Sequence, residues 1–320
     1  MKARGPLLVL ATCAALAASV GACGGAERVG PPPAAPRVTT PVQAIPADLD
    51  VVVRIDLAPI RSSLPAVAQT DLAAVALAGD ASAASDVVRR ALDRAEQAWI
   101  GFRPGQDPVD TDNVLVLRGN FSSIPSAELG DAFEPARDLG GGWSAYDARS
   151  VRARSAPARL YTHLDDLWVI ASEAELDAVE RVIESGARER RLEPPERGII
   201  SVAARMPGVA ASIRSSSPKA ARFLSNADVG TLSADLGADG LEVFAELGFV
   251  DEATAERSAR ALSIVLGVLT AAHPEGFRAS TEVHTVGSAV TLRAKVPHEL
   301  LASLLPREPS DAGEAAQKTP

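Results

Sequence analysis

Residues 229–249 restrict the possible folds more than any other stretch, because apolar residues occupy every second position. One arm carries Leu232, Ala234 and Leu236, and the other carries Leu241, Val243, Ala245, Leu247 and Phe249. Asp239-Gly240 between the arms is typical of a tight turn. A period of two residues is that of a strand with one buried face. This stretch therefore predicts an antiparallel hairpin in a sheet that is covered on one side.

The order of elements predicts two similar units in tandem, residues 47–190 and 191–305. Each begins with a buried strand, at 51–57 and at 198–206, and continues as β-α-β-β-α-β-β-α, with an additional strand near 143–148 in the first unit. Hairpins argue against a parallel doubly wound sheet, in which helices separate the strands. We therefore expect an α+β fold of two tandem similar units, each an antiparallel sheet with helices packed on one face. Residue identity between the halves is low, so the repeat depends on the pattern of elements alone.

A helix is predicted to follow Ser172. Ser172 and Glu175 have the spacing of a capping box, and Leu176, Val179 and Ile183 fall on one side of a helix. This helix closes the first predicted unit.

The first 23 residues have the pattern of an export signal. Basic residues precede an apolar run at 7–20, which is shorter than the roughly 20 residues needed to cross a bilayer. The run ends in the sequence VGAC at 20–23, which resembles the lipobox of bacterial lipoproteins. This resemblance implies cleavage between Ala22 and Cys23, addition of a diacylglycerol to the Cys23 thiol, and acylation of the new N-terminus. A plain signal peptide with a cysteine here by chance is the alternative.

The resemblance divides the chain into further parts. We expect a signal peptide at 1–22, a lipidated Cys23 with a proline-rich tether at 23–46, the folded body, and a disordered tail at 306–320. Two or more acyl chains hold a protein stably on a membrane, so the resemblance implies a protein anchored in the cell envelope. Gly24 favours the outer membrane, and the face that the protein occupies stays open.

Cysteine content excludes several kinds of site from the body. The chain has two cysteines, and Cys13 lies within the predicted signal. With Cys23 used for the anchor, the mature body would have no cysteine for a disulfide, a thiolate nucleophile or a zinc site.

The negative charge of the chain limits the classes of partner that it can bind. The formal net charge is −9, and removal of the signal with Lys2 and Arg4 would leave −11. An acidic chain does not suit the phosphate backbone of nucleic acids, and an aromatic content of 4% gives no platform for stacking bases. We expect no nucleic-acid partner, and contact with the membrane through the lipid anchor only.

One short motif raises the possibility of an enzyme. Ser216, Ser217, Pro218 and Lys219 fit S-x-x-K, in which a lysine activates the serine of penicillin-recognising enzymes, but the S-D-N and K-T-G elements of those enzymes are missing. The alternative is a helix that begins at Pro218 with Ser217 as its N-cap. We favour the helix start and expect no catalytic residues, although a serine hydrolase using Ser216 and Lys219 stays an alternative.

Metal and cofactor sites are not expected. None of the four histidines, His163, His273, His284 and His298, has a second histidine at ligand spacing. Asp107, Asp110 and Asp112 could bind Ca²⁺, but the stretch lacks the glycine and the closing glutamate of an EF-hand loop. A solvated acidic turn is the interpretation we favour.

Charged residues within the strands suggest one further kind of site. Arg54 and Asp56 interrupt the first buried strand, and Arg205 lies in the related strand of the second unit. They indicate a water-exposed sheet face, one ion pair across strands, or a polar groove on the uncovered face.

Three functions are compatible with these features. The first is a lipid-anchored envelope protein with a non-catalytic role, which binds a partner protein or supports the envelope. The second is a carrier or sensor of an apolar or lipid-like ligand held between helices and sheet. The third is the hydrolase. We prefer the first, since the anchor, the tether and the missing catalytic motifs all fit it.

Overall fold

The computed structural model describes residues 38, 40–63, 83–104, 112–151, 156–186, 192–271 and 281–297. The predicted signal, Cys23, most of the tether, the last predicted helix and the tail lie outside these ranges.

The elements follow the predicted order with additions. In the first half they are η1 (Pro41–Ala44), β1 (Val51–Asp56), α2 (Leu57–Ser63), α4 (Ala83–Arg94), β2 (Ala95–Phe102), β3 (Asn113–Gly119), α5 (Ser126–Ala132), β4 (Phe133–Gly140), β5 (Trp143–Ala148), β6 (Arg159–His163), β7 (Leu167–Ala171), η3 (Glu173–Glu175) and α6 (Leu176–Ser185). In the second half they are β8 (Ile200–Arg205), α7 (Met206–Ser212), α8 (Pro218–Leu224), β9 (Ala227–Gly237), β10 (Gly240–Phe249), α9 (Glu252–Ala271), β11 (Thr281–Val286) and β12 (Ala289–Pro297).

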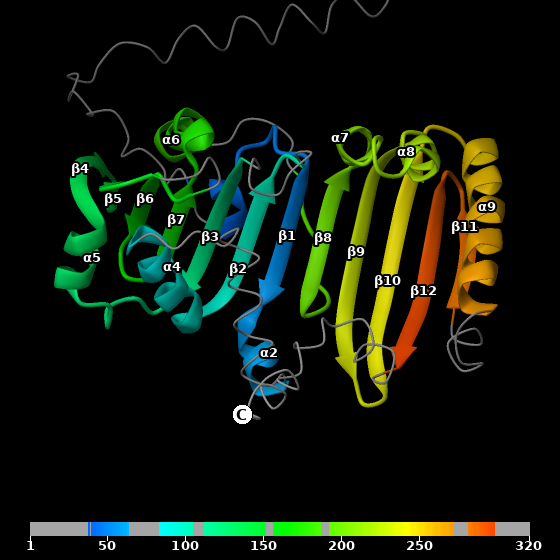
Figure 1. Cartoon of the computed structure of the whole chain (residues 1–320), viewed down its shortest axis with the longest axis horizontal. Helices are drawn as coiled ribbons and strands as arrows, with labels where there is room; N and C mark the ends of the chain where they lie inside the picture. Colours follow the sequence, from blue (N-terminus) through cyan, green and yellow to red (C-terminus); the bar gives the residue numbers. More distant parts are fainter. Residues whose placement is uncertain are drawn as a thin grey trace, which may run out of the picture. The chain divides into compact units, whose positions relative to one another are not determined.

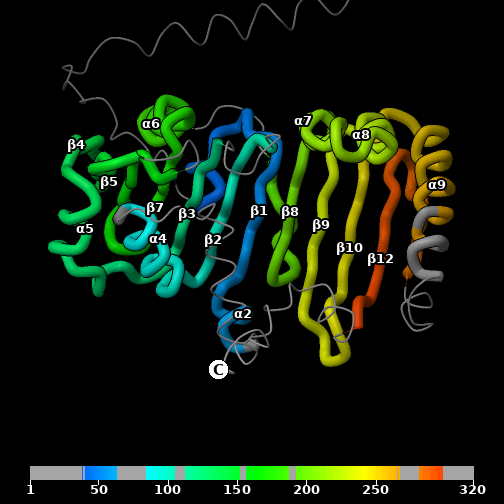
Figure 2. The backbone as a smooth tube through the Cα atoms, viewed as in Figure 1, coloured from blue at the N-terminus to red at the C-terminus, as the bar shows by residue number. Residues whose placement is uncertain are grey.

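All twelve strands belong to one sheet, in the order β11-β12-β10-β9-β8-β1-β2-β3-β7-β6-β5-β4 (Figure 1). Each of the pairings is antiparallel. The prediction of an α+β fold with antiparallel strands is thus confirmed. The expectation of a separate sheet for each unit is wrong, because β1 pairs with β8 and joins the halves. Figure 2 shows these two strands, distant in the sequence, side by side in the middle of the sheet.

Alternate side chains point to the two sides of the sheet, which we call face A and face B. Face A carries Val52 on β1, Trp99 on β2 and Val116 on β3, and face B carries Ile55 and Leu115. On face B, α2, α4 and α5 cover the first half, and α7, α8 and α9 cover part of the second. Helix α4, for example, buries Val87, Val88 and Ala91 against the strands. The apolar period of each helix explains this packing.

Face A is covered in the first half as well. Helix α6 buries Val179, Val182 and Ile183 there, in one cluster with Val169 and Tyr161. The prediction that helices lie on one face is therefore wrong for the first half. The reason is that face A of β3 and β7 is apolar too, so a second layer has to cover it.

The folded part begins earlier than residue 47, the first residue of the folded body in the sequence analysis. Val38, Ala44 and Ile45 are buried in the face A cluster. Gly101 on β2 allows this packing, because a Cβ there would lie 2.6 Å from Ile45 and 2.7 Å from Leu49. The boundary predicted from proline content was therefore too late in the chain. Prolines do not prevent the segment around η1 from burying apolar residues such as Ala44 and Ile45.

Local predictions were mostly confirmed. The hairpin β9–β10 turns at residues 238–239 and the long helix α9 follows it, whereas β4 and α7 were not predicted. The prediction of a capping box at Ser172 is wrong, because the Ser172 side chain makes no capping hydrogen bond. The Ser172 hydroxyl instead accepts a hydrogen bond from the Asn113 amide at 3.0 Å, and the Glu175 carboxylate pairs with Arg103.

Candidate functional site

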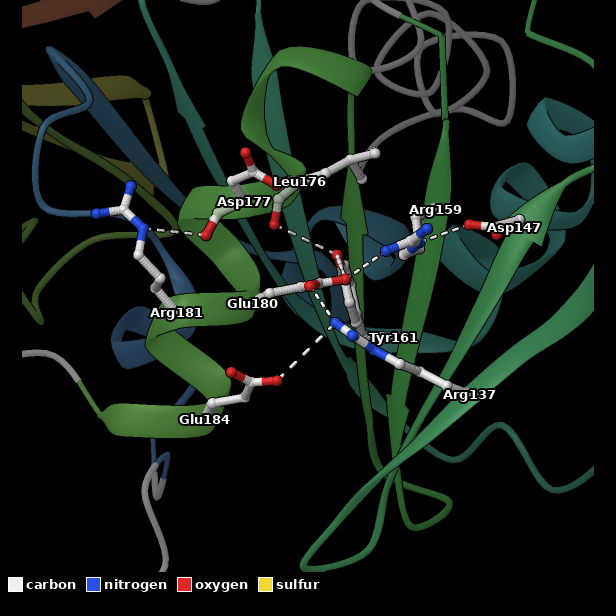
Figure 3. Close-up of polar contacts among 9 residues, drawn as sticks. All are labelled: Arg137, Asp147, Arg159, Tyr161, Leu176, Asp177, Glu180, Arg181 and Glu184. Atoms are coloured by element: carbon white, nitrogen blue, oxygen red, sulfur yellow. Dashed lines mark hydrogen bonds and ion pairs between the residues drawn. The ribbon is translucent and has the colours of Figure 1, made fainter.

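A polar network fixes α6 onto face A of the first half. Glu180 of α6 lies between Arg137 of β4 and Arg159 of β6, and its carboxylate pairs with both guanidinium groups (Figure 3). Arg159 also pairs with Asp147 of β5 at 2.5 Å. Half-buried charges that are paired and hydrogen-bonded in this way hold elements in one orientation. The network therefore fixes α6 to β4 and β6.

Tyr161 belongs to the same network. Its side chain is fully buried, and its hydroxyl donates weakly to the Leu176 carbonyl at 3.5 Å and to Glu180 Oε1 at 3.4 Å. Burial, followed by the negative charge of Glu180, raises the pKa of Tyr161 well above its ordinary value. The phenol thus stays neutral, which suits a structural role and not that of a general base.

A second ion-pair group connects η3 with the segments that follow η1 and β2. Arg103 contacts Asp48 at 2.5 Å and also the carboxylate of Glu175, which is 1% exposed. Burial raises the pKa of Glu175 although Arg103 opposes the change. This group holds together the segments that cover face A.

Face A of the second half has a different character. Apart from Phe244 on β10, its positions on four neighbouring strands carry polar or charged side chains: Thr231, Ser233 and Asp235 on β9, Glu242 and Glu246 on β10, Glu282 and His284 on β11, and Thr291, Arg293 and Lys295 on β12. Asp235, Glu242 and Arg293 are exposed. Among the described residues, the buried clusters of face A stop at Ala203. A sheet face with this composition is suited to contact with water or with a polar partner.

Residues 192–199, which we call the strap, cross face A between the two halves. Leu192 is buried in the cluster of the first half, Arg54 of β1 donates to the Glu196 carbonyl at 2.7 Å, and Ile199 accepts from the Asp56 amide at 2.8 Å. Gly198 has a φ of +85°, and a Cβ there would lie 2.7 Å from the Ala234 carbonyl oxygen. Only glycine therefore lets the strap lie this close to β9.

A hollow of about 460 Å³ lies beside the strap on this polar surface. Its charged lining residues are Arg197 of the strap, Asp235, Glu242, Glu282, Arg293 and Lys295. Phe244 lies among them: the Arg197 guanidinium carbon is 3.7 Å from the centre of its ring, and that of Arg293 is 5.7 Å away. This hollow is the candidate binding site, because it combines concavity with convergent polar groups.

The charged strand residues that the sequence singled out lie near this surface but do not line the hollow. Arg54 pairs with Asp56 at 2.5 Å, and Gln97 of β2 donates to Asp56 at 2.7 Å. Arg205 donates to the carbonyls of Leu49 at 2.7 Å and Ala47 at 2.5 Å. Arg54, Asp56 and Arg205 therefore hold neighbouring segments together. The polar residues that line the hollow were not predicted as a site, although three of them, Ser233, Asp235 and Glu242, lie between the apolar residues of the predicted hairpin at 229–249.

The S-x-x-K residues do not form a catalytic pair in this structure. Ser216 and Lys219 are both exposed, and the Ser216 hydroxyl donates to the Ile213 carbonyl at 3.2 Å. Helix α8 begins at Pro218 as expected, but the Ser217 side chain makes no capping hydrogen bond.

Two further surveys concern the described residues only. No group of three or more histidine, cysteine, aspartate or glutamate side chains is placed there to hold a metal ion; of the acidic turn, Asp107 and Asp110 lie outside the description. Nor is any helix in these ranges long and apolar enough to cross a bilayer.

Comparisons with known proteins give a fold resemblance alone. No protein family and no curated protein matches the sequence of this chain. Among solved structures, crystal form I of TP0453 is similar with a TM-score of 0.48 and 12% identity, covering 84% of this chain and 97% of that one. Crystal form III of TP0453 has a TM-score of 0.48 and 11% identity, covering 83% of this chain and 97% of that one.

Proposed function

We propose that this chain is a lipid-anchored protein of the cell envelope that binds a partner protein through face A of its second half. The role is one of binding or support and not of catalysis. The lipobox-like sequence ending at Cys23 supports the anchor, and the outer membrane is the favoured location. The observation that carries the proposal is the polar surface around the hollow, which contrasts with the closed face A of the first half.

We also propose that the two halves are copies of one unit. The strand order β1-β2-β3-β7-β6 on one side of the β1–β8 pair corresponds to β8-β9-β10-β12-β11 on the other. Helices follow the first strand of each half, and η1 and the strap precede it. The strands β4 and β5 are then an addition to the first copy.

Site-specific crosslinking in cells tests the binding surface. A photoreactive amino acid at Thr291, on face A of β12, is expected to give a discrete crosslinked product with another envelope protein. The same group at Arg260, an exposed position on α9 with 73% of its side chain accessible, is the control and should give none. Equal products from both positions, or none from Thr291, would contradict the proposal.

Replacement of one residue tests the anchor. The Cys23→Ala variant should leave the membrane fraction after a high-salt wash, because it has no thiol to receive a lipid. Mass spectrometry of the mature wild-type N-terminus should find acyl chains. A variant that still sediments with membranes would show that the protein is held there by other means.

An apolar ligand is the second candidate from the sequence. The hollow is lined mainly by charged and polar side chains, so it does not favour this alternative. Lipid extraction of the purified protein would reveal such a ligand.

A further inference from the structure

The charges around the hollow are arranged in two rows across the strands. In the first row, Phe244 pairs in register with Arg293 of β12, which in turn pairs with Glu282 of β11, and Arg197 lies over the Phe244 ring. In the second row, Asp235 pairs in register with Glu242, which pairs with Lys295. Lys295 is already engaged, since its ammonium contacts Asp239 at 2.8 Å. The first row thus has two arginines and one carboxylate, Glu282, and the second has two carboxylates and one lysine, so the first row is net positive and the second net negative.

The guanidinium groups of Arg197 and Arg293 are available to an acidic group. Within the described ranges, neither has a carboxylate at ion-pair distance, and both lie against the ring of Phe244. Contact with a ring leaves the N–H donors in the guanidinium plane free and limits the motion of the side chain. Two positive groups near one ring repel each other, and a carboxylate that binds both would relieve this repulsion.

The spacing of the rows defines what could bind both of them. Residues two positions apart on a strand point to the same face and are separated by about 7 Å, so the positive and negative rows are also about 7 Å apart. An extended peptide has the same spacing between its residues i and i+2. The opening of the hollow favours a peptide over an enclosed small molecule, because sites for small molecules bury most of their ligand, whereas Asp235, Glu242 and Arg293 are exposed.

We propose that the hollow binds an extended segment of the partner protein with an acidic residue and, two positions away, a basic residue. The acidic side chain lies between Arg197 and Arg293, and the basic one faces Asp235 and Glu242. This inference depends on the proposed function, because it names the chemistry by which face A recognises its partner.

A peptide titration tests the inference on the full-length mature protein in detergent. The probe is the blocked peptide Ac-Ala-Glu-Ala-Lys-Ala-NH2, followed by saturation-transfer NMR. We expect a Kd on the order of 1 mM. The comparison peptides replace either Glu or Lys by Gln, and each should bind several-fold more weakly. Equal binding of the three peptides, or no binding of the first up to about ten times the expected Kd, would overturn the inference.

Variants of the protein connect the binding to the two rows. Arg293→Glu and Glu242→Lys should each weaken binding about tenfold or more. Arg260→Glu on α9 is the matched control, and it should leave binding unchanged. Arg197→Gln is the second variant of the positive row, to be used if Arg293→Glu loses its near-UV circular dichroism. A loss of binding in the control as large as in the others contradicts the site.

The crosslink from Thr291 separates this inference from the proposed function. If the Arg293→Glu protein still forms the wild-type crosslink in cells, the charge pattern is wrong and the binding surface stands. If wild-type protein forms no crosslink, the proposed partner is wrong, whatever the peptides do.

Discussion

Face A of the sheet is covered by a second layer in the first half of the molecule, whereas in the second half it carries polar and exposed side chains. Both halves have the same order of five strands, yet Val116 and Val169 are fully buried under α6 in the first, whereas Glu246 and Thr291 occupy face A in the second. Face B carries a buried apolar cluster in both halves, so it does not distinguish them. The side chains at alternate positions, and not the strand order, decide whether a second layer covers the sheet.

The largest expected loss of unfolding free energy comes from a new charge on the covered part of face A, and the same change on the exposed part serves as the comparison. Val169→Asp should lower the free energy of unfolding by more than about 4 kcal/mol, since it buries an unpaired carboxylate. Thr291→Asp, on the same face of β12, should lower it by less than about 1 kcal/mol, because its surroundings are polar and partly exposed. Urea unfolding followed by tryptophan fluorescence measures both. Similar losses would mean that the second half is also closed.

A smaller effect is expected where α6 is attached. Glu180→Gln removes the charge that pairs with Arg137 and Arg159, and should cost about 1–2 kcal/mol of unfolding free energy, because the carboxylate is mostly buried. The matched change Glu242→Gln on the open surface should cost under about 0.5 kcal/mol. If the order of the two losses is reversed, the network does not hold the helix.

The smallest expected effect is a change with pH in the stability difference between wild type and a Glu175 variant. Burial raises the pKa of Glu175, so the folded protein binds this proton more tightly than the unfolded chain. The stability that this group contributes is present at low pH and is lost as the pH rises through its raised pKa. Glu175→Gln cannot ionise, so its stability relative to wild type should increase as the pH rises from about 4 towards 7. Thermal unfolding at several pH values checks this, and a change in the opposite direction would refute it.

Periodicity in the sequence was enough to predict most of the strands, although β4 was not among them. Alternation over residues 229–249 and the Asp239-Gly240 turn led to β9 and β10 directly. The polar residues of the site were present in the same alternation, at positions such as Ser233 and Glu242, and became visible as a surface only when the strands were placed side by side. A single hairpin does not show which strands lie beside it.

The placement of α6 and the joining of the halves could not be predicted in this way. The apolar side of α6 predicts burial but does not indicate the face of the sheet on which it packs. The β1–β8 pair depends on residues about 150 positions apart, as the Arg54–Glu196 contact illustrates with a separation of 142. The charges of Arg54 and Asp56 left a polar groove as one alternative to a water-exposed face or an ion pair, and in the structure the two residues pair with each other and bond to the strap and to β2.

The β1–β8 pair also bears on how the chain reaches its final state. Arg205 bonds to carbonyls 156 and 158 positions earlier, so this seam forms only after both ends of a very long loop meet. Until then, β1 would present a bare edge of N–H and C=O groups to any other extended chain. Synthesis of β8 therefore covers this edge of β1, and the exposed edge moves to β8 until β9 pairs with it.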